Sequence, residues 1–145
     1  MENDFYKYPL QFSKLFKIDD LQRCGLGESI SQNLQLIITS HYGEHRYNPV
    51  YGCEIWEMDF DLIMSLKVWE EKLRKSLERA ILENEKRIEK ADIEVKISEV
   101  ERKFDAAKLA SIKRKVDIYM RASIVSTGES FRFHTDLFLS PISYN

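Results

Sequence analysis

The residues that most often carry out catalysis are sparse in this chain and form no catalytic pattern. His41, His45 and His134 have no companion motif, although His45 lies beside Glu44 and Arg46 and has the chemistry of a general base. The sequence contains no nucleophile elbow, no zinc-protease helix motif and no glycine-rich phosphate loop. Among 24 acidic residues, some pair always has the separation that glycoside cleavage needs. The number of acidic residues is therefore no evidence for a glycosidase. The sequence therefore predicts a protein that is not an enzyme.

The two cysteines also lack the spacing of a functional site. Cys24 and Cys53 each lie beside a glycine, with no Cys-x-x-Cys pattern and no histidine at metal-ligand spacing. We expect two buried or half-buried free thiols in a reducing compartment. The sequence predicts no metal site and no cofactor.

Composition restricts the classes of partner. In 145 residues, 22 basic side chains against 24 acidic ones give a net charge of −2, whereas nucleic-acid and membrane-surface proteins need a cationic excess. Lys113-Arg114-Lys115 is one short basic run, and we interpret it as a solvated strand end. No apolar run is long enough to span a membrane, and the first residues do not resemble a signal peptide. We predict one cytoplasmic domain over residues 1–145, with residues 1–18 as an N-terminal arm, no nucleic-acid partner and no membrane insertion.

Hydrophobic periodicity predicts two helices in the first two thirds of the chain. The first begins at a capping Ser29, carries an apolar stripe from Ile30 to Ile38, and ends near Tyr42-Gly43. An irregular stretch rich in aromatic residues follows over 43–60. A second, longer helix is predicted over 61–90, with a charged face that includes the pairs Glu70–Arg74 and Glu71–Lys75.

Beyond residue 91 the apolar period changes from that of a helix to that of a strand. Alternation over 93–98, 116–124 and 131–139 predicts three strands, the last two joined by a hairpin at 126–129. Residues 104–111 are expected to form a loop or one helical turn. The fold class is therefore α+β, with an N-terminal helix and one long helix packed on a small antiparallel sheet of about three C-terminal strands. Such a sheet has two edges, and the strand near 130–139 is a good candidate for an exposed one.

Two segments are candidates for partner binding. The loop over 43–52 combines two glycines, a proline, two tyrosines and the charged residues Glu44 and Arg46, and it either contacts a partner or caps the core. At 85–87, Glu85 and Arg87 point in different directions if the helix continues. If the helix ends there, both can reach one partner surface; the alternative is an ordinary solvated helix terminus.

These segments resemble the GPW/gp25-like family, which includes the baseplate wedge subunit of contractile-tailed phages and TssE of type VI secretion systems. The resemblance covers roughly residues 8–140, and the chain is most like TssE. It rests on the run from Ile30 to Thr39 and on the family's helix–Gly-Glu-Arg–loop–Pro-x-aromatic-Gly pattern. That pattern is matched by Gly43, Glu44, Pro49, Tyr51 and Gly52, with His45 where the family has arginine and Arg46 one position later.

A second motif of that family, Glu-Pro-Arg at the end of the long helix, falls on Glu85-Lys86-Arg87. Lys86 replaces the proline, so the helix is expected to continue further here than in relatives.

The resemblance implies a structural baseplate subunit that docks on the wedge through Glu85 and Arg87 and starts sheath assembly by offering a sheet edge. The implied partners are wedge subunits (TssF/TssG/TssK-like) and contractile sheath subunits (TssB/TssC-like). Strand addition uses main-chain hydrogen bonds, with alternating side chains setting the register. The candidate residues at the edge are Phe131, Phe133 and Thr135.

Two other functions remain open from sequence. A lysozyme-like peptidoglycan hydrolase would need a cleft with two carboxylates, one of raised pKa. A small cytoplasmic regulatory adaptor is compatible with the same fold, because fold does not fix function. The sequence also leaves open whether the machine is a phage tail or a secretion system.

Overall fold

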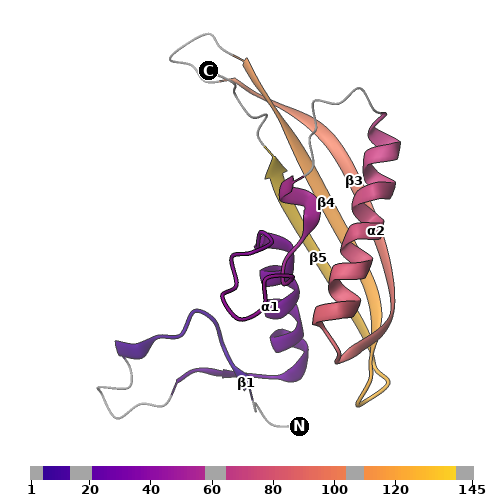
Figure 1. The fold of residues 1–145 in the computed structure, drawn as a ribbon. Helices are drawn as coiled ribbons and strands as arrows, with labels where there is room; N and C mark the ends of the chain where they lie inside the picture. The colour runs from indigo at the N-terminus through magenta and orange to yellow at the C-terminus, as the bar shows by residue number, and fades with distance from the viewer. Residues whose placement is uncertain (1–4, 14–20, 58–64, 104–109, 140–145) are drawn as a thin grey trace.

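The computed structural model describes residues 5–13, 21–57, 65–103 and 110–139. It confirms the predicted α+β class, with helices preceding a three-stranded antiparallel sheet (Figure 1). In chain order the elements are β1 (Phe5–Tyr6), β2 (Arg23–Cys24), α1 (Leu26–Thr39), the 3-10 helix η2 (Glu54–Glu57), α2 (Leu66–Asn84), β3 (Ile88–Lys103), β4 (Ala110–Ile124) and β5 (Ser130–Leu139).

The main sheet has the order β3-β4-β5, so β4 is the central strand. Ile88 lies opposite Ile124 at one end of the β3–β4 ladder, and β5 pairs with β4 from Ser130 opposite Ser123. The β4–β5 hairpin turns where predicted, with Gly128 at φ +71° donating to the Ile124 carbonyl. That geometry is a bulge in which glycine takes the left-handed position.

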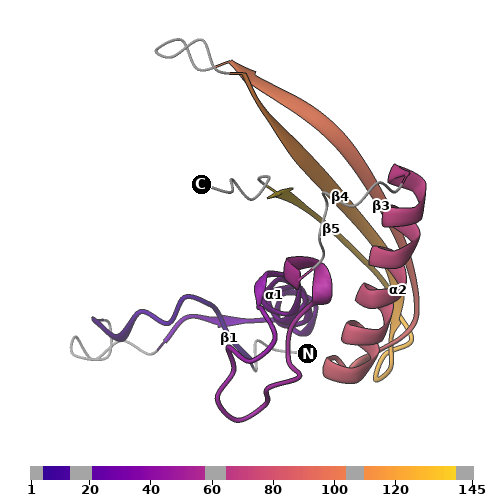
Figure 2. The same cartoon turned by 45° about the horizontal axis from the view of Figure 1, so that its top comes forward.

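Both helices cover one face of this sheet. Figures 1 and 2 show α2 running along β3 and α1 beside β5. The strands turn alternate apolar residues toward the helices, and these merge with both helices into a single core. From the helices it receives Ile30, Leu34, Ile37, Ile38, Trp69, Leu73, Leu77, Ala80 and Ile81. The opposite face of the sheet is mostly polar and also carries the exposed Tyr119 and Phe138.

The predicted start of the first helix was wrong by four residues, because the N-cap is Gly25 and not Ser29. Helix α1 begins at Leu26 with an extended Gly25 at the N-cap, and it ends at Thr39 rather than near Tyr42. Ser29 therefore lies within the helix, and its hydroxyl makes a tertiary hydrogen bond instead of capping.

The predicted end of the second helix was also wrong. Helix α2 ends at Asn84, Glu85 is already extended, and β3 begins at Ile88, five residues before the expected strand. The expectation that the helix runs through Lys86 is therefore wrong, and Ile88 is instead buried as a strand residue. At its other end α2 is capped by Ser65; the expected helical residues 61–64 lie outside the described residues. Of the expected loop at 104–111, residues 110–111 belong to β4 and the rest is not described.

Part of the N-terminal arm packs on α1. Strands β1 and β2 pair antiparallel, with Phe5 opposite Cys24. The arm is held by the Lys7–Glu28 ion pair at 3.0 Å and by the Tyr8 N–H, which donates to the Gln32 side chain. Both contacts bring the arm to the first turns of α1.

Candidate functional site

The structure brings Glu85 and Arg87 together at the junction between α2 and β3. Glu85 has an extended backbone, and Lys86 and Arg87 form a turn before β3, in which the Arg87 N–H donates to Glu85 Oε1 at 3.0 Å. Arg87 Nε donates to Glu85 Oε1 at 2.8 Å and Nη2 donates to Oε2 at 2.7 Å, a bidentate pair. Arg87 Nη1 donates to Ser29 Oγ at 2.8 Å, which ties the junction to α1. The two charges therefore bind each other rather than pointing in different directions.

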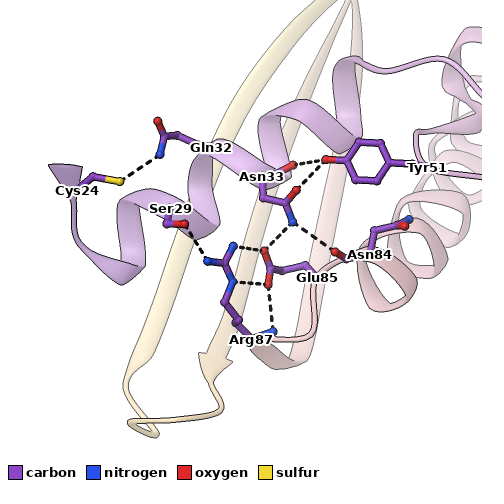
Figure 3. A network of polar contacts seen from close by, with 8 residues as sticks. All are labelled: Cys24, Ser29, Gln32, Asn33, Tyr51, Asn84, Glu85 and Arg87. Atoms are coloured by element: carbon purple, nitrogen blue, oxygen red, sulfur yellow. Dashed lines mark hydrogen bonds and ion pairs between the residues drawn. The ribbon is translucent and has the colours of Figure 1, made fainter. Parts of the chain in front are cut away.

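An amide and a phenol complete the network around Glu85 (Figure 3). Asn33 Nδ2 donates to Glu85 Oε2 at 2.8 Å and to the Asn84 carbonyl at 3.3 Å. The Tyr51 hydroxyl donates to Asn33 Oδ1 at 2.7 Å. Through these bonds and those of Arg87, the loop, α1, the end of α2 and the turn before β3 share one polar cluster.

Electrostatics keep the Glu85–Arg87 pair charged. The Glu85 residue is only 2% exposed, and burial by itself raises its pKa; the hydrogen bonds from Arg87 and Asn33 outweigh burial, so the pKa lies below its ordinary value. The hydrogen bond to Glu85 likewise raises the pKa of Arg87. Burial and the nearby Glu85 carboxylate raise the pKa of Tyr51 to about 12, so its hydroxyl remains a donor.

Arg87 faces a groove of about 530 Å³ between the N-terminal arm, α1 and the junction. Its side chain is 33% exposed, whereas that of Glu85 is 2% exposed. The Phe5 ring lies 5.4 Å from the Arg87 guanidinium carbon, at cation–π distance. Three of the five N–H groups of Arg87 are used within the chain, which leaves two for a ligand. The groove is lined by Phe5, Tyr6, Tyr8, Ser29, Gln32, Asn33, Leu36, Asn84, Glu85, Lys86 and Arg87.

The candidate loop residues Glu44 and Arg46 lie apart from this groove. Glu44 Oε2 accepts from the His41 N–H at 3.1 Å, which closes the loop on itself, and the exposed Arg46 lies 5.6 Å from the Tyr47 ring centroid. The second half of the loop packs against the core through Tyr51. Its tip is open to solvent, with Tyr47 85% exposed. The loop thus caps the core with one half and exposes the other.

The three candidate residues on β5 turn their side chains toward the helices. Phe131 is buried, Phe133 packs on the core, and the Thr135 hydroxyl donates to Gln35 Oε1 on α1 at 2.9 Å. They are part of the interior face of the sheet, so a partner at the edge of β5 would meet other groups.

In the middle of β5, the backbone groups that point away from β4 belong to the even-numbered residues from Arg132 to Asp136. Backbone groups of an antiparallel strand point alternately to one neighbour and to the other side. The Ile97 N–H on β3 points away from β4, because Glu70 accepts it; Val116, which lies opposite Ile97, therefore points to Leu137 on β5. Odd residues of β5 are thus bonded to β4, and the N–H and C=O groups of Arg132, His134 and Asp136 point outward. The hairpin bond from the Ile124 N–H to the Glu129 carbonyl leads to the same assignment, because it shows that the odd-numbered Glu129 points toward β4.

The two edges of the sheet differ in the described part of the chain. Glu70 on α2 accepts the outward Ile97 N–H at 2.9 Å, so α2 covers part of the β3 edge. The predicted Glu70–Arg74 pair is therefore wrong; Arg74 binds Glu71 and Glu78 instead, while the Glu71–Lys75 pair is present at 3.7 Å. No described strand pairs with the outer side of β5, which makes it the open edge.

The histidines take part in ring stacking. His41 stacks on Trp56 with ring centroids 5.0 Å apart, and His134 stacks on Tyr119 at 4.4 Å. Cys24 and Cys53 are free and buried, as predicted. Within the described ranges no group of three or more metal-binding side chains comes together. In the same part of the chain no helix has the length and apolar character to cross a membrane.

Comparison with known proteins identifies the family. The family model described as baseplate wedge protein gp25 matches residues 25–127, well over half of the chain. The chain therefore belongs to the GPW/gp25 family of baseplate proteins, and the resemblance seen in the sequence is confirmed. It is a structural baseplate protein of a phage or contractile injection machine, and as a wedge-family member it assembles with other baseplate proteins.

A solved structure shares the fold. A crystal structure from Geobacter sulfurreducens that carries the name of a tail lysozyme matches with a TM-score of 0.60 and 19% identity, covering 86% of this chain and 100% of that one. At this level of identity the likeness concerns the fold alone. No curated protein matches the chain.

Glu85 and Arg87 were predicted as site residues, whereas Ser29 and Asn33, which bind them, were not. A signal was present. Ser29 and Asn33 are four residues apart, so they form a polar line on α1 beside the apolar stripe of Ile30 and Leu34. A polar line that borders a buried stripe indicates side chains that bond to a neighbouring element.

Proposed function

We propose that this protein is a TssE-like baseplate subunit that docks on wedge subunits and templates the contractile sheath through the open edge of β5. The observation that carries this proposal is the difference between the sheet edges. The β3 edge is partly covered by Glu70, whereas outward backbone groups of β5 meet no described strand. A sheath strand added there would form main-chain hydrogen bonds to Arg132, His134 and Asp136.

Wedge docking is assigned to the groove beside Arg87. Its aromatic wall offers apolar contact, and the two remaining N–H groups of Arg87 suit a carboxylate of a wedge subunit. Because Glu85 is buried, we assign it the role of positioning Arg87 rather than that of contacting the partner. The partners proposed here are TssF/TssG/TssK-like for the groove and TssB/TssC-like for the edge, in the cytoplasm.

Proline substitution at alternate positions of β5 tests the edge assignment. His134→Pro removes an outward N–H, which edge strands tolerate, so we expect a folded protein that no longer co-purifies with sheath subunits. His134→Val removes the same side chain but keeps the N–H, and we expect it to retain the sheath. Phe133→Pro removes an N–H bonded to β4, so we expect it to lower Tm by several degrees.

Sheath binding that survives His134→Pro in a folded protein would refute the use of this edge. Circular dichroism of each variant shows whether it is folded.

We also propose that the protein works without catalysis. A lysozyme-like acid needs a raised pKa, whereas Glu85, the buried carboxylic acid among the described residues, has a lowered pKa. We expect no clearing of a peptidoglycan suspension by the purified protein at concentrations where hen lysozyme clears it within minutes. Clearing that depends on one or two carboxylates of this chain would favour the hydrolase instead.

A further inference from the structure

The charged side chains on the solvent-facing side of β5 are placed symmetrically about His134. Arg132, His134 and Asp136 alternate along this face, all three exposed. Arg132 lies directly opposite Arg121 on β4, a like-charge pair that destabilises a sheet. Within the described residues neither guanidinium has an ion pair or a hydrogen bond. Arg132 is thus a basic group at a sheet edge whose nearest cross-strand neighbour repels it.

A second copy of β5 would place an acidic residue opposite Arg132. Consider two copies of β5 paired antiparallel so that His134 of one copy lies opposite His134 of the other. Residues at equal distances before and after His134 then face each other, so Arg132 of each copy lies opposite Asp136 of the other. Both charge pairs are attractive, and they form together because the arrangement is two-fold symmetric.

The interior face of the strand matches in the same register. Phe131 of one copy lies opposite Leu137 of the other, and Phe133 lies opposite Thr135. The larger apolar residues therefore continue the core side of the sheet, and the charged residues continue its polar side. A shift of one residue would reverse this alternation.

The backbone groups that point away from β4 also fit this register. The outward N–H and C=O groups belong to Arg132, His134 and Asp136, as the bond from the Ile97 N–H to Glu70 requires. Directly opposed residues in this register therefore exchange hydrogen bonds with each other.

We propose that the protein self-associates as a two-fold dimer through antiparallel β5–β5 pairing centred on His134, with Arg132 of each copy bound to Asp136 of the other. The dimer joins the two three-stranded sheets into one and covers the edge that would otherwise invite aggregation. It excludes any other strand from the same edge, so a strand-donating partner must displace the second copy. The proposal does not depend on sheath binding, because it concerns the purified chain alone.

Charge exchange between two positions tests the register. Arg132→Glu replaces the two Arg132–Asp136 attractions of the dimer with two Glu–Asp repulsions. Asp136→Arg replaces them with two Arg–Arg repulsions. We expect each single variant to raise the dimer Kd by about tenfold or more. The double variant R132E/D136R restores both attractions with their signs exchanged, and an equimolar mixture of the two single variants restores them in a heterodimer. Sedimentation velocity over a range of concentrations measures all four.

Folding and general charge effects have their own controls. Glu at position 132 faces Arg121, so Arg132→Glu replaces a repulsive cross-strand pair with an attractive one and should not lower Tm. Arg79→Glu on the exposed face of α2 makes the same change in net charge away from the edge and should leave the dimer intact. A wild-type chain that remains monomeric at 200 μM would overturn the proposal. So would single variants that dimerise like the wild type, or a mixture and double variant that fail to recover.

Discussion

Glu85 is a carboxylate placed where carboxylates are rarely tolerated, at the buried junction between a helix and a strand. Both of its oxygens accept charge-assisted or amide hydrogen bonds, from Arg87 and Asn33. Removing one partner of such a pair leaves an uncompensated buried charge and typically costs about 3–5 kcal/mol, whereas replacing both with groups of similar volume is often neutral. Variants at this junction should therefore change both residues together.

The lowered pKa of Glu85 predicts acid-sensitive stability. A carboxyl group whose pKa is lower in the folded state contributes stability above its unfolded pKa, about 4.3, and loses it as the pH falls through the folded value. We expect the free energy of unfolding, measured by urea denaturation between pH 2.5 and pH 7, to fall over this window in the wild type. In Glu85→Gln/Arg87→Met the fall should be smaller.

Glu71 needs a separate control because its pKa is also lowered, chiefly by the hydrogen bond from Arg74. This pair is solvent-exposed, so Glu71→Gln should change the acid window little. An unchanged acid profile in the double variant would show that Glu85 is not responsible.

At the level of elements, the close contact between the loop and the end of α1 requires a residue without a side chain at position 52, which is Gly52. Gly52 has φ +135°, and a Cβ at this position would lie 2.6 Å from the Ser40 carbonyl oxygen, which accepts the Cys53 N–H. Both the backbone conformation and the space exclude a side chain. This accounts physically for the glycine that ends the Pro-x-aromatic-Gly pattern.

Replacing each of two glycines with alanine distinguishes the steric effect at Gly52 from the general effect of replacing a glycine. We expect Gly52→Ala to lower the free energy of unfolding by about 2–3 kcal/mol. At Gly27, in the first turn of α1, no atom lies within 4 Å of the position that a Cβ would occupy. Gly27→Ala should stabilise the protein by up to about 1 kcal/mol, because alanine loses less backbone entropy. Denaturant titration of both variants measures the contrast, and equal effects would refute the steric argument.

The elements that sequence could predict are those whose period is unambiguous. The apolar stripe of α1 and the alternation of β5 each fit one structure only, and both are present. The end of α2 was missed because Ile88 follows Ile81 and Asn84 at helical spacing and also begins an alternating run. The burial of Glu85 could not be anticipated, since it depends on Asn33, about fifty residues earlier. Which edge is open depends likewise on Glu70 reaching β3.

For the whole molecule, the two proposed functions would use different groups. Wedge docking would use a side chain, Arg87, in a groove walled by the arm and α1. Sheath templating would use backbone groups of β5, and no residue that lines the groove belongs to that strand. Sites without shared partners are expected to act additively.

Separate variants should therefore lose separate partners. Glu85→Gln/Arg87→Met removes both charges but keeps the packing volume, so we expect it to fold, to lose wedge subunits in a pull-down and to retain sheath subunits. His134→Pro should do the reverse. Arg79→Ala, at an exposed position on α2, controls for loss of a surface charge. If His134→Pro also lost the wedge, or the junction variant also lost the sheath while remaining folded, the two sites would be coupled. A baseplate that docks first and templates second would then need a conformational link between the α2–β3 junction and β5.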